Sequence, residues 1–157
     1  MEFEELYNVY SPKVFRLCLG YVNDKDQAKD LTQETFIRVW QSLDKFRNES
    51  SVGTWIFRIA SNICLRQIDR SSKMIKTEVP FQLEDKKEEH LSEQLEILYK
   101  CIATLEETER LIISLVLEDL PQKEIAAITG ISEGNLRVKI HRIKQVLTQR
   151  FNEYAKL

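Results

Sequence analysis

The most chemically specific stretch of this chain is a run of basic side chains near its C-terminal end. Residues 134–150 carry five Arg or Lys side chains and no Asp or Glu, so this segment has a net charge of +5. Side chains of this kind on a helix bind DNA phosphates and, inside the major groove, the edges of guanine. An ordinary surface helix with a solvated basic side has the same composition, so the neighbouring residues must separate the two interpretations.

The residues before this segment predict a helix-turn-helix. Pro121 is placed to start a short helix, and Gly130 is placed to end it because glycine accepts the left-handed conformation. Ala126 is small enough for two helices to cross closely, and Ser132 is placed to cap the second helix. The second helix has an apolar inner stripe, and its outer side carries Arg137, His141 and Lys144 or Gln145, flanked by Lys139 and Arg142.

A second candidate surface lies in residues 46–70, where a polar loop precedes a helix. Asn48, Ser50 and Ser51 belong to the loop and Trp55 lies at its junction with the helix. Small polar side chains beside an aromatic ring are suited to receive an unstacked base. The helix carries polar side chains at successive i+4 steps, hence on one face: Arg58, Asn62, Arg66 and Arg70. Taken alone, this pattern favours a solvated helix face with Trp55 in the core.

The elements that position these residues are helices, because four Gly and three Pro are too few for the turns of a sheet protein. Apolar spacing predicts one helix over 2–21, with Ser11-Pro12 as a restart or kink, one beginning at Asp24, and one over about 54–70. Residues 71–92 lose the periodicity and predict a linker. The expected fold class is all-α: a helical domain over 1–70, this linker, and a second helical domain over 93–157 that contains the helix-turn-helix.

Charge and composition narrow the function classes. The formal net charge is −2, but residues 50–76 carry +4 and residues 84–133 carry −8, so two basic segments flank an acidic one. The N-terminal residues contain no secretory signal and no window is apolar enough to span a membrane, so we expect a cytoplasmic protein without membrane insertion. No phosphate-binding loop or nucleophile–base pair marks an enzyme, and we expect neither a metal nor another cofactor. The cysteines predict reduced core residues: Cys18, Cys64 and Cys101.

Three motifs in order carry a resemblance to a known family. The segment DLTQETFIRVW, the segment FRNESSVGTWIFRIASNICLRQIDR and, after the linker, the segment GNLRVKIHRIKQVL resemble the extracytoplasmic-function (ECF) sigma factors of bacteria. The resemblance covers nearly the whole chain. It implies that residues 1–70 are sigma domain 2 and residues 93–157 are sigma domain 4, and that the partners are core RNA polymerase, promoter DNA and an anti-sigma factor.

The resemblance also implies residue roles. The helix over 30–40 is similar to the one that docks on core polymerase, which assigns polymerase binding to Asp30, Gln33, Glu34, Phe36 and Arg38. The loop and helix that follow are similar to the part that recognises the minus-ten element. There Asn48, Ser50 and Ser51 shape a pocket for a flipped base next to Trp55, and the backbone is held by Arg58, Asn62, Arg66 and Arg70. The resemblance assigns binding of the minus-thirty-five element to Arg137, Val138, Lys139, His141 and Arg142.

Two other functions fit parts of the sequence. A helix-turn-helix regulator that acts without polymerase would use residues 122–147 in the same way and would bind a palindrome as a dimer. A protein-interaction module would not need the basic side chains at all. The family often has Thr at the position of Asn135 and Arg at that of Lys139, which leaves the sequence of the minus-thirty-five element open.

Overall fold

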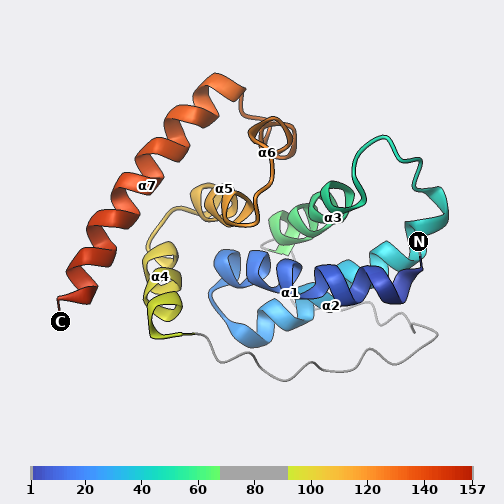
Figure 1. Ribbon diagram of the computed structural model, residues 1–157, viewed down its shortest axis with the longest axis horizontal. Helices are drawn as coiled ribbons and strands as arrows, with labels where there is room; N and C mark the ends of the chain where they lie inside the picture. Colours follow the sequence, from blue (N-terminus) through green and yellow to red (C-terminus); the bar gives the residue numbers. More distant parts are fainter. Residues whose placement is uncertain (1, 68–91, 157) are drawn as a thin grey trace.

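The computed structural model describes residues 2–67 and 92–156, and throughout these ranges the regular structure is helical (Figure 1). The predicted all-α class is therefore confirmed. In chain order the elements are α1 (Phe3–Val22), α2 (Lys25–Ser42), the 3-10 turn η1 (Leu43–Lys45), α3 (Val52–Arg66), α4 (Glu93–Ala103), α5 (Glu107–Leu117), α6 (Gln122–Thr129) and α7 (Glu133–Ala155).

The first three helices pack on one another around an apolar core. Asp24 ends the turn after α1 and starts α2, because its carboxylate accepts hydrogen bonds from the backbone amides of Asp26 and Gln27. Phe36 on α2 is fully buried, with its ring edge-on to that of Tyr7 at 5.0 Å between centroids. This packing fixes the direction of α2 and leaves its opposite face exposed.

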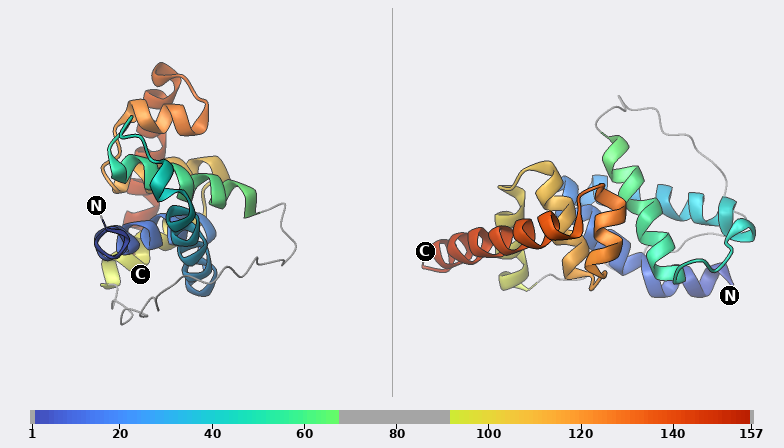
Figure 2. Two further views of the ribbon diagram at one scale, coloured as in Figure 1. Left: turned by 90° about the vertical axis from the view of Figure 1, so that its right-hand side faces the viewer. Right: turned by 90° about the horizontal axis from the view of Figure 1, so that it is seen from above.

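The C-terminal helices form a second cluster in which the long α7 packs along α4 and crosses α5 and α6. A capping box between Glu106 and Glu109 begins α5, and the Ser92 side chain caps α4. In the view from above, α7 extends away from the N-terminal helices (Figure 2). The end that extends is the C-terminal one, whereas the first turns of α7 lie beside α6 at the upper edge of the ribbon in Figure 1.

One helix boundary differs from the sequence-based expectation, and of the two alternatives left open at Ser11-Pro12 the restart is excluded. Pro12 lies inside a single helix, α1, so the chain neither restarts nor ends there. The third helix begins at Val52 rather than near residue 54, because the side chain of Ser51 caps it by accepting a hydrogen bond from the Thr54 amide. Helix ends depend on such side-chain caps, which apolar spacing alone does not locate.

The two clusters contact each other directly. Helix α1 packs against α4 and α5, and α3 packs against α6. At the closest point a Cβ on Gly20 would lie 2.1 Å from the Oγ of Ser114, so only glycine allows α1 and α5 to approach in this way. Most of the predicted linker lies outside the described residues, and the bounds of the two domains remain a prediction.

The three cysteines are buried and unpaired, as expected. The Sγ of Cys64 donates to that of Cys18 at 3.8 Å across the α1–α3 contact. This hydrogen bond and burial together raise the pKa of the Cys64 thiol well above its ordinary value. Along residues 2–67 and 92–156, every helix is too short or too polar to cross a membrane.

Candidate nucleic-acid and polymerase interfaces

The predicted helix-turn-helix is present in α6 and α7. Gly130 ends α6 in the left-handed conformation, with φ of +75°, and its amide donates to the Ala126 carbonyl. Ser132 then caps α7 by accepting a hydrogen bond from the Asn135 amide at 3.3 Å. Ile125 and Leu136 are fully buried where the two helices meet. The turn is therefore fixed by its own residues, which holds the first turns of α7 in one orientation.

The outer face of α7 is exposed as the sequence predicted. Its inner stripe, Leu136, Ile140, Ile143 and Leu147, is buried against the other helices. The side chains assigned to the minus-thirty-five element all lie in solvent, and Val138 is 51% exposed. This face combines cations for phosphate with an apolar side chain that suits a thymine methyl group. The exposed candidates are Arg137, Val138, Lys139, His141 and Arg142.

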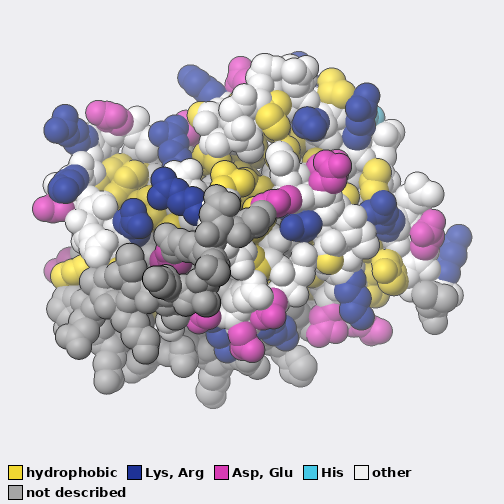
Figure 3. Space-filling view, turned by 180° about the vertical axis from the view of Figure 1, so that it is seen from behind, with side chains coloured by type: hydrophobic (Ala, Val, Ile, Leu, Met, Phe, Trp, Pro, Cys, Tyr) yellow, Lys and Arg dark blue, Asp and Glu magenta, His cyan; other side chains and the backbone are white. Residues whose placement is uncertain are grey.

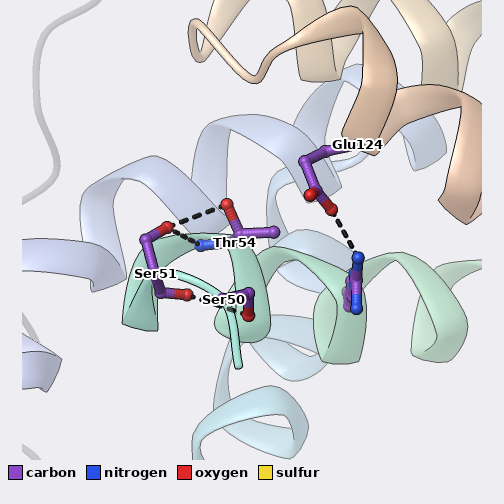
Figure 4. A network of polar contacts seen from close by, with 5 residues as sticks. Ser50, Ser51, Thr54 and Glu124 are labelled. Atoms are coloured by element: carbon purple, nitrogen blue, oxygen red, sulfur yellow. Dashed lines mark hydrogen bonds and ion pairs between the residues drawn. The ribbon is translucent and has the colours of Figure 1, made fainter. Parts of the chain in front are cut away.

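The loop before α3 is ordered by its own serines. Ser50 donates to the Ser51 carbonyl at 3.3 Å, and Ser51 donates to the Thr54 hydroxyl at 2.9 Å while it caps the helix (Figure 4). Asn48 is exposed and holds a positive φ of 56°. The ring of Trp55 lies 4.8 Å from that of Phe46 at an interplanar angle of 30°. The loop thus gathers small polar groups beside an aromatic pair.

The polar stripe on α3 contains both side chains that are exposed to solvent and one that forms an ion pair. Asn62 and Arg66 are exposed, whereas Arg58 is partly buried and forms an ion pair with Glu124 of α6 at 2.5 Å (Figure 4). The Nε atom of Arg58 is buried without a hydrogen-bond partner. Arg70 lies outside the described residues. One cation assigned to promoter DNA is therefore occupied by a carboxylate from the helix-turn-helix.

Helix α2 presents part of the predicted polymerase-binding set on its outer face. Asp30, Gln33 and Arg38 are exposed, and Glu34 is half-buried and engaged in other contacts. Phe36 does not belong to this face, because it is fully buried between α1 and α2. It belongs to the apolar stripe of α2, whose other buried members include Leu31 and Val39. Phe36 therefore supports the outer face from below and offers no surface of its own.

Three acidic residues that sequence analysis did not single out join the two helical clusters. Glu118 accepts three hydrogen bonds from the Arg16 guanidinium, at 2.7 to 3.2 Å, and only 6% of its side chain is exposed. Glu107 accepts from the Tyr21 hydroxyl, and Glu124 pairs with Arg58. The sequence signal was the acidic segment over 84–133, but it does not show which carboxylates face α1 and α3.

Two tyrosine side chains near the contact between the two helical clusters have raised pKa values. Burial, followed by the hydrogen bond to Glu107, raises the pKa of Tyr21 well above its ordinary value. Burial and the nearby Glu118 carboxylate raise the pKa of Tyr99 to about 12. Arg110 completes this region by donating to the Tyr21 carbonyl at 2.9 Å. Both phenols are thus held in the neutral form.

Charge is mixed on the face of the molecule opposite to the one drawn in Figure 1. On the face seen from behind, Lys and Arg side chains stand interspersed with Asp and Glu (Figure 3).

Comparison with known proteins decides the family. The family model described as Sigma-70 region 2 matches residues 6–74, and the family model described as Sigma-70, region 4 matches residues 95–147. The sigma-E factor of Haemophilus influenzae, an ECF RNA polymerase sigma factor, is 31% identical over 92% of this chain and 85% of its own length. The chain belongs to the ECF sigma factors. SigM of Bacillus subtilis, another ECF sigma factor, is 29% identical over 97% of this chain and 96% of that protein.

Solved structures show the same fold. The sigma factor RpoE of Bartonella quintana, in complex with the anti-sigma factor NepR, matches 96% of both chains with a TM-score of 0.73 and 21% identity. CnrH, in complex with the cytosolic domain of CnrY, matches 96% of this chain and 88% of that one, with a TM-score of 0.69 and 20% identity. The family models and the relatives, rather than these structures, show that the protein is an RNA polymerase sigma factor of the ECF type, and a regulator that acts without polymerase is not favoured.

Proposed function

We propose that this ECF sigma factor works through three surfaces that the sequence assigned to separate tasks. The outer face of α2 docks on core RNA polymerase through Asp30, Gln33, Glu34 and Arg38, with Phe36 buried beneath it. The loop before α3 and the stripe on that helix bind and melt the minus-ten element. The exposed face of α7 binds the minus-thirty-five element in the major groove.

The observation that carries the proposal is the exposed face of α7. Five side chains at its N-terminal end point to solvent, three of them are Arg or Lys, and the turn before them is fixed by Gly130 and Ser132. A helix-turn-helix places this end of its second helix in the major groove. The residues over 1–70 and 93–157 act as separate domains in this scheme, one for each promoter element.

The two DNA-binding surfaces are each too small to bind tightly alone. About six phosphate contacts shared between them give a salt slope near −5, so binding by the free chain is weak at physiological salt. Core polymerase holds both domains on one template and raises the effective concentration of the second contact. The protein therefore acts by binding rather than by catalysis, in the cytoplasm where polymerase and promoters lie.

An anti-sigma factor is the proposed regulator. The sigma factor RpoE of Bartonella quintana was solved in complex with the anti-sigma factor NepR, and it shares the fold of this chain over 96% of its length. The exposed faces of α2, α3 and α7 are the surfaces whose occupation would block polymerase and promoter.

The test is gel filtration with bacterial core polymerase, followed by transcription from genomic fragments. Combined Gln33→Ala and Arg38→Ala should abolish co-elution, while exposed Lys25→Ala at the start of the same helix should not. Combined Arg137→Ala and Arg142→Ala should leave co-elution intact and remove the new transcription starts, with Thr148→Ala as the matched control on α7. Failure of the unsubstituted chain to co-elute, together with tight binding to DNA alone, would overturn the proposal.

A further inference from the structure

The contact between the two helical clusters leaves buried polar atoms without partners. Among the described residues, three buried side-chain atoms have no hydrogen-bond partner: the Nε of Arg58 and the hydroxyl oxygens of Ser61 and Ser114. Ser114 lies on α5 against Gly20 of α1. Arg58 reaches Glu124 of α6, and Ser61 follows Arg58 by three residues, hence on the same side of α3. The three atoms therefore lie where the two clusters meet.

Such atoms weaken the contact that buries them. A polar group that is buried without a hydrogen bond is less stable than the same group in water, and native protein interiors contain few of them. When the two clusters separate, water reaches these groups and the penalty disappears. The penalty therefore exists only while the clusters touch, which is expected of a contact that opens and closes rather than of a permanent core.

Gly20 faces the C-terminal cluster. The atoms nearest to a Cβ built on it belong to Ser114 and Tyr99, on α5 and α4, at 2.1 to 3.9 Å. The side chains of α2 and α3 are not among these nearest atoms. A larger side chain at this position would therefore push against α5 first, and it would act on the contact between the clusters before it disturbed the packing of the first three helices.

The closed arrangement does not fit a promoter. The minus-ten and minus-thirty-five elements are about 25 base pairs apart, which is about 85 Å along the DNA axis at about 3.4 Å per base pair. In this structure α3 contacts the helix-turn-helix directly, with Arg58 and Glu124 2.5 Å apart. The longest helix, α7, spans only about 35 Å. A chain that binds both elements must therefore separate its two clusters.

We propose that the contacts of α1 with α5 and of α3 with α6, here called the latch, hold the free chain in an autoinhibited state. The unpartnered hydroxyl of Ser114 limits the strength of the latch. Helix α6 covers the side of α3 that carries Arg58, and core polymerase uncovers it by holding the clusters apart. The inference rests on the proposed function, because it assumes that α3 and α7 bind the two promoter elements.

One variant should open the latch. Gly20→Val places a branched side chain where Ser114 now lies, so it should increase the radius of gyration in small-angle X-ray scattering and leave the helical circular dichroism unchanged. The affinity of the free chain for a promoter fragment should rise about ten-fold, as expected when the open form increases from about a tenth of the chains to nearly all of them. Asn8→Val, at an exposed position of the same helix, should change neither quantity.

A second variant should strengthen the latch. Ser114→Ala removes the unpartnered hydroxyl and adds no atom, so it removes a penalty of the closed state alone. The free chain should bind the same promoter fragment about five-fold more weakly, and its Tm should rise by about 2–4 °C. A serine with only a structural role would change the Tm and leave the affinity for DNA as it was.

The holoenzyme separates the latch from the promoter contacts. Core polymerase already holds the clusters apart, so the unsubstituted chain, Gly20→Val and Ser114→Ala should bind the promoter fragment equally as holoenzymes. If the unsubstituted holoenzyme does not prefer this fragment to one with both elements scrambled, the proposed function fails, whatever the latch does.

Three results would overturn the inference. These are a folded Gly20→Val chain that stays closed, a Gly20→Val chain that opens but binds DNA no better than before, and a Ser114→Ala chain with unchanged affinity. Because Ser114→Ala adds no bulk, it tests the inference even if Gly20→Val does not fold.

Discussion

The contact between the two helical clusters should open when Glu118 loses its charge. Glu118→Gln keeps the shape of the side chain but leaves one acceptor oxygen where the Arg16 guanidinium now has two. Hydrogen bonds to charged groups contribute about 1.5–3 kcal/mol, and this carboxylate is almost fully buried. We expect a loss of about 1–3 kcal/mol, which shifts the ratio of closed to open chains by about 5- to 150-fold.

The opening expected for Glu118→Gln can be compared with that expected for Glu124→Gln, which weakens the other ion pair between the two helical clusters. The side chains of Arg58 and Glu124 are 43% and 23% exposed, so water and salt screen their attraction. Pairs of this kind contribute about 0.2–1 kcal/mol, which corresponds to no more than about a five-fold shift. The structure thus predicts an order of effects: Glu118→Gln opens the chain more than Glu124→Gln does.

Energy transfer between dyes on Lys25→Cys and Gln149→Cys measures the opening, because the two positions are exposed and lie in different clusters. The native cysteines are buried and should not react with the dyes. Transfer should fall most in Glu118→Gln, less in Glu124→Gln, and further in both as salt increases. Unchanged transfer in a folded Glu118→Gln chain, or a larger change in Glu124→Gln, would refute the reasoning.

Three further outcomes follow from single side chains. Phe36→Ala should cost about 3–5 kcal/mol of the free energy of unfolding in urea, because it empties a fully buried site, whereas exposed Arg38→Ala should leave the transition nearly unchanged. Because the pKa of Tyr99 is raised to about 12 in the folded chain, its share of stability is complete below pH 10 and is lost as pH rises from 10 toward 12. Urea unfolding across that range should show a smaller loss in Tyr99→Phe. Arg142→Ala should reduce the salt slope of holoenzyme binding to promoter DNA by about 1, with Thr148→Ala unchanged.

Local chemistry made much of the fold predictable. Asp24 and Ser132 cap helices, and Gly130 ends one, because each acts on backbone groups within a few residues. The apolar stripe of α7 depends on one spacing rule and placed its exposed face correctly. The sequence therefore predicted correctly that the side chains of the candidate minus-thirty-five surface are exposed.

Contacts between distant residues were not accessible in this way. Arg58 and Glu124 are 66 positions apart, and nothing in the spacing of either helix identifies the other as its partner. Phe36 shows a related limit, because a family motif names a residue without stating whether it contacts the partner or supports the residues that do. Burial against Phe3 and Tyr7 answers that question only once α1 and α2 are packed.

The Arg58 pair also connects the acidic segment to the proposed function. A guanidinium binds a carboxylate and a phosphate through the same donors, so Glu124 occupies the group that we assign to the promoter backbone. The Nη2 atom of Arg58 contacts Glu124, and the negative charge of that carboxylate opposes a phosphate at the same guanidinium. We therefore expect α6 to leave α3 before the stripe binds DNA as a unit. By linkage, if opening favours promoter binding by some factor, promoter DNA favours the open chain by the same factor. A chain opened by Glu118→Gln should therefore bind promoter DNA more tightly without polymerase, and equal affinity in the two chains would show that Arg58 takes no part in that binding.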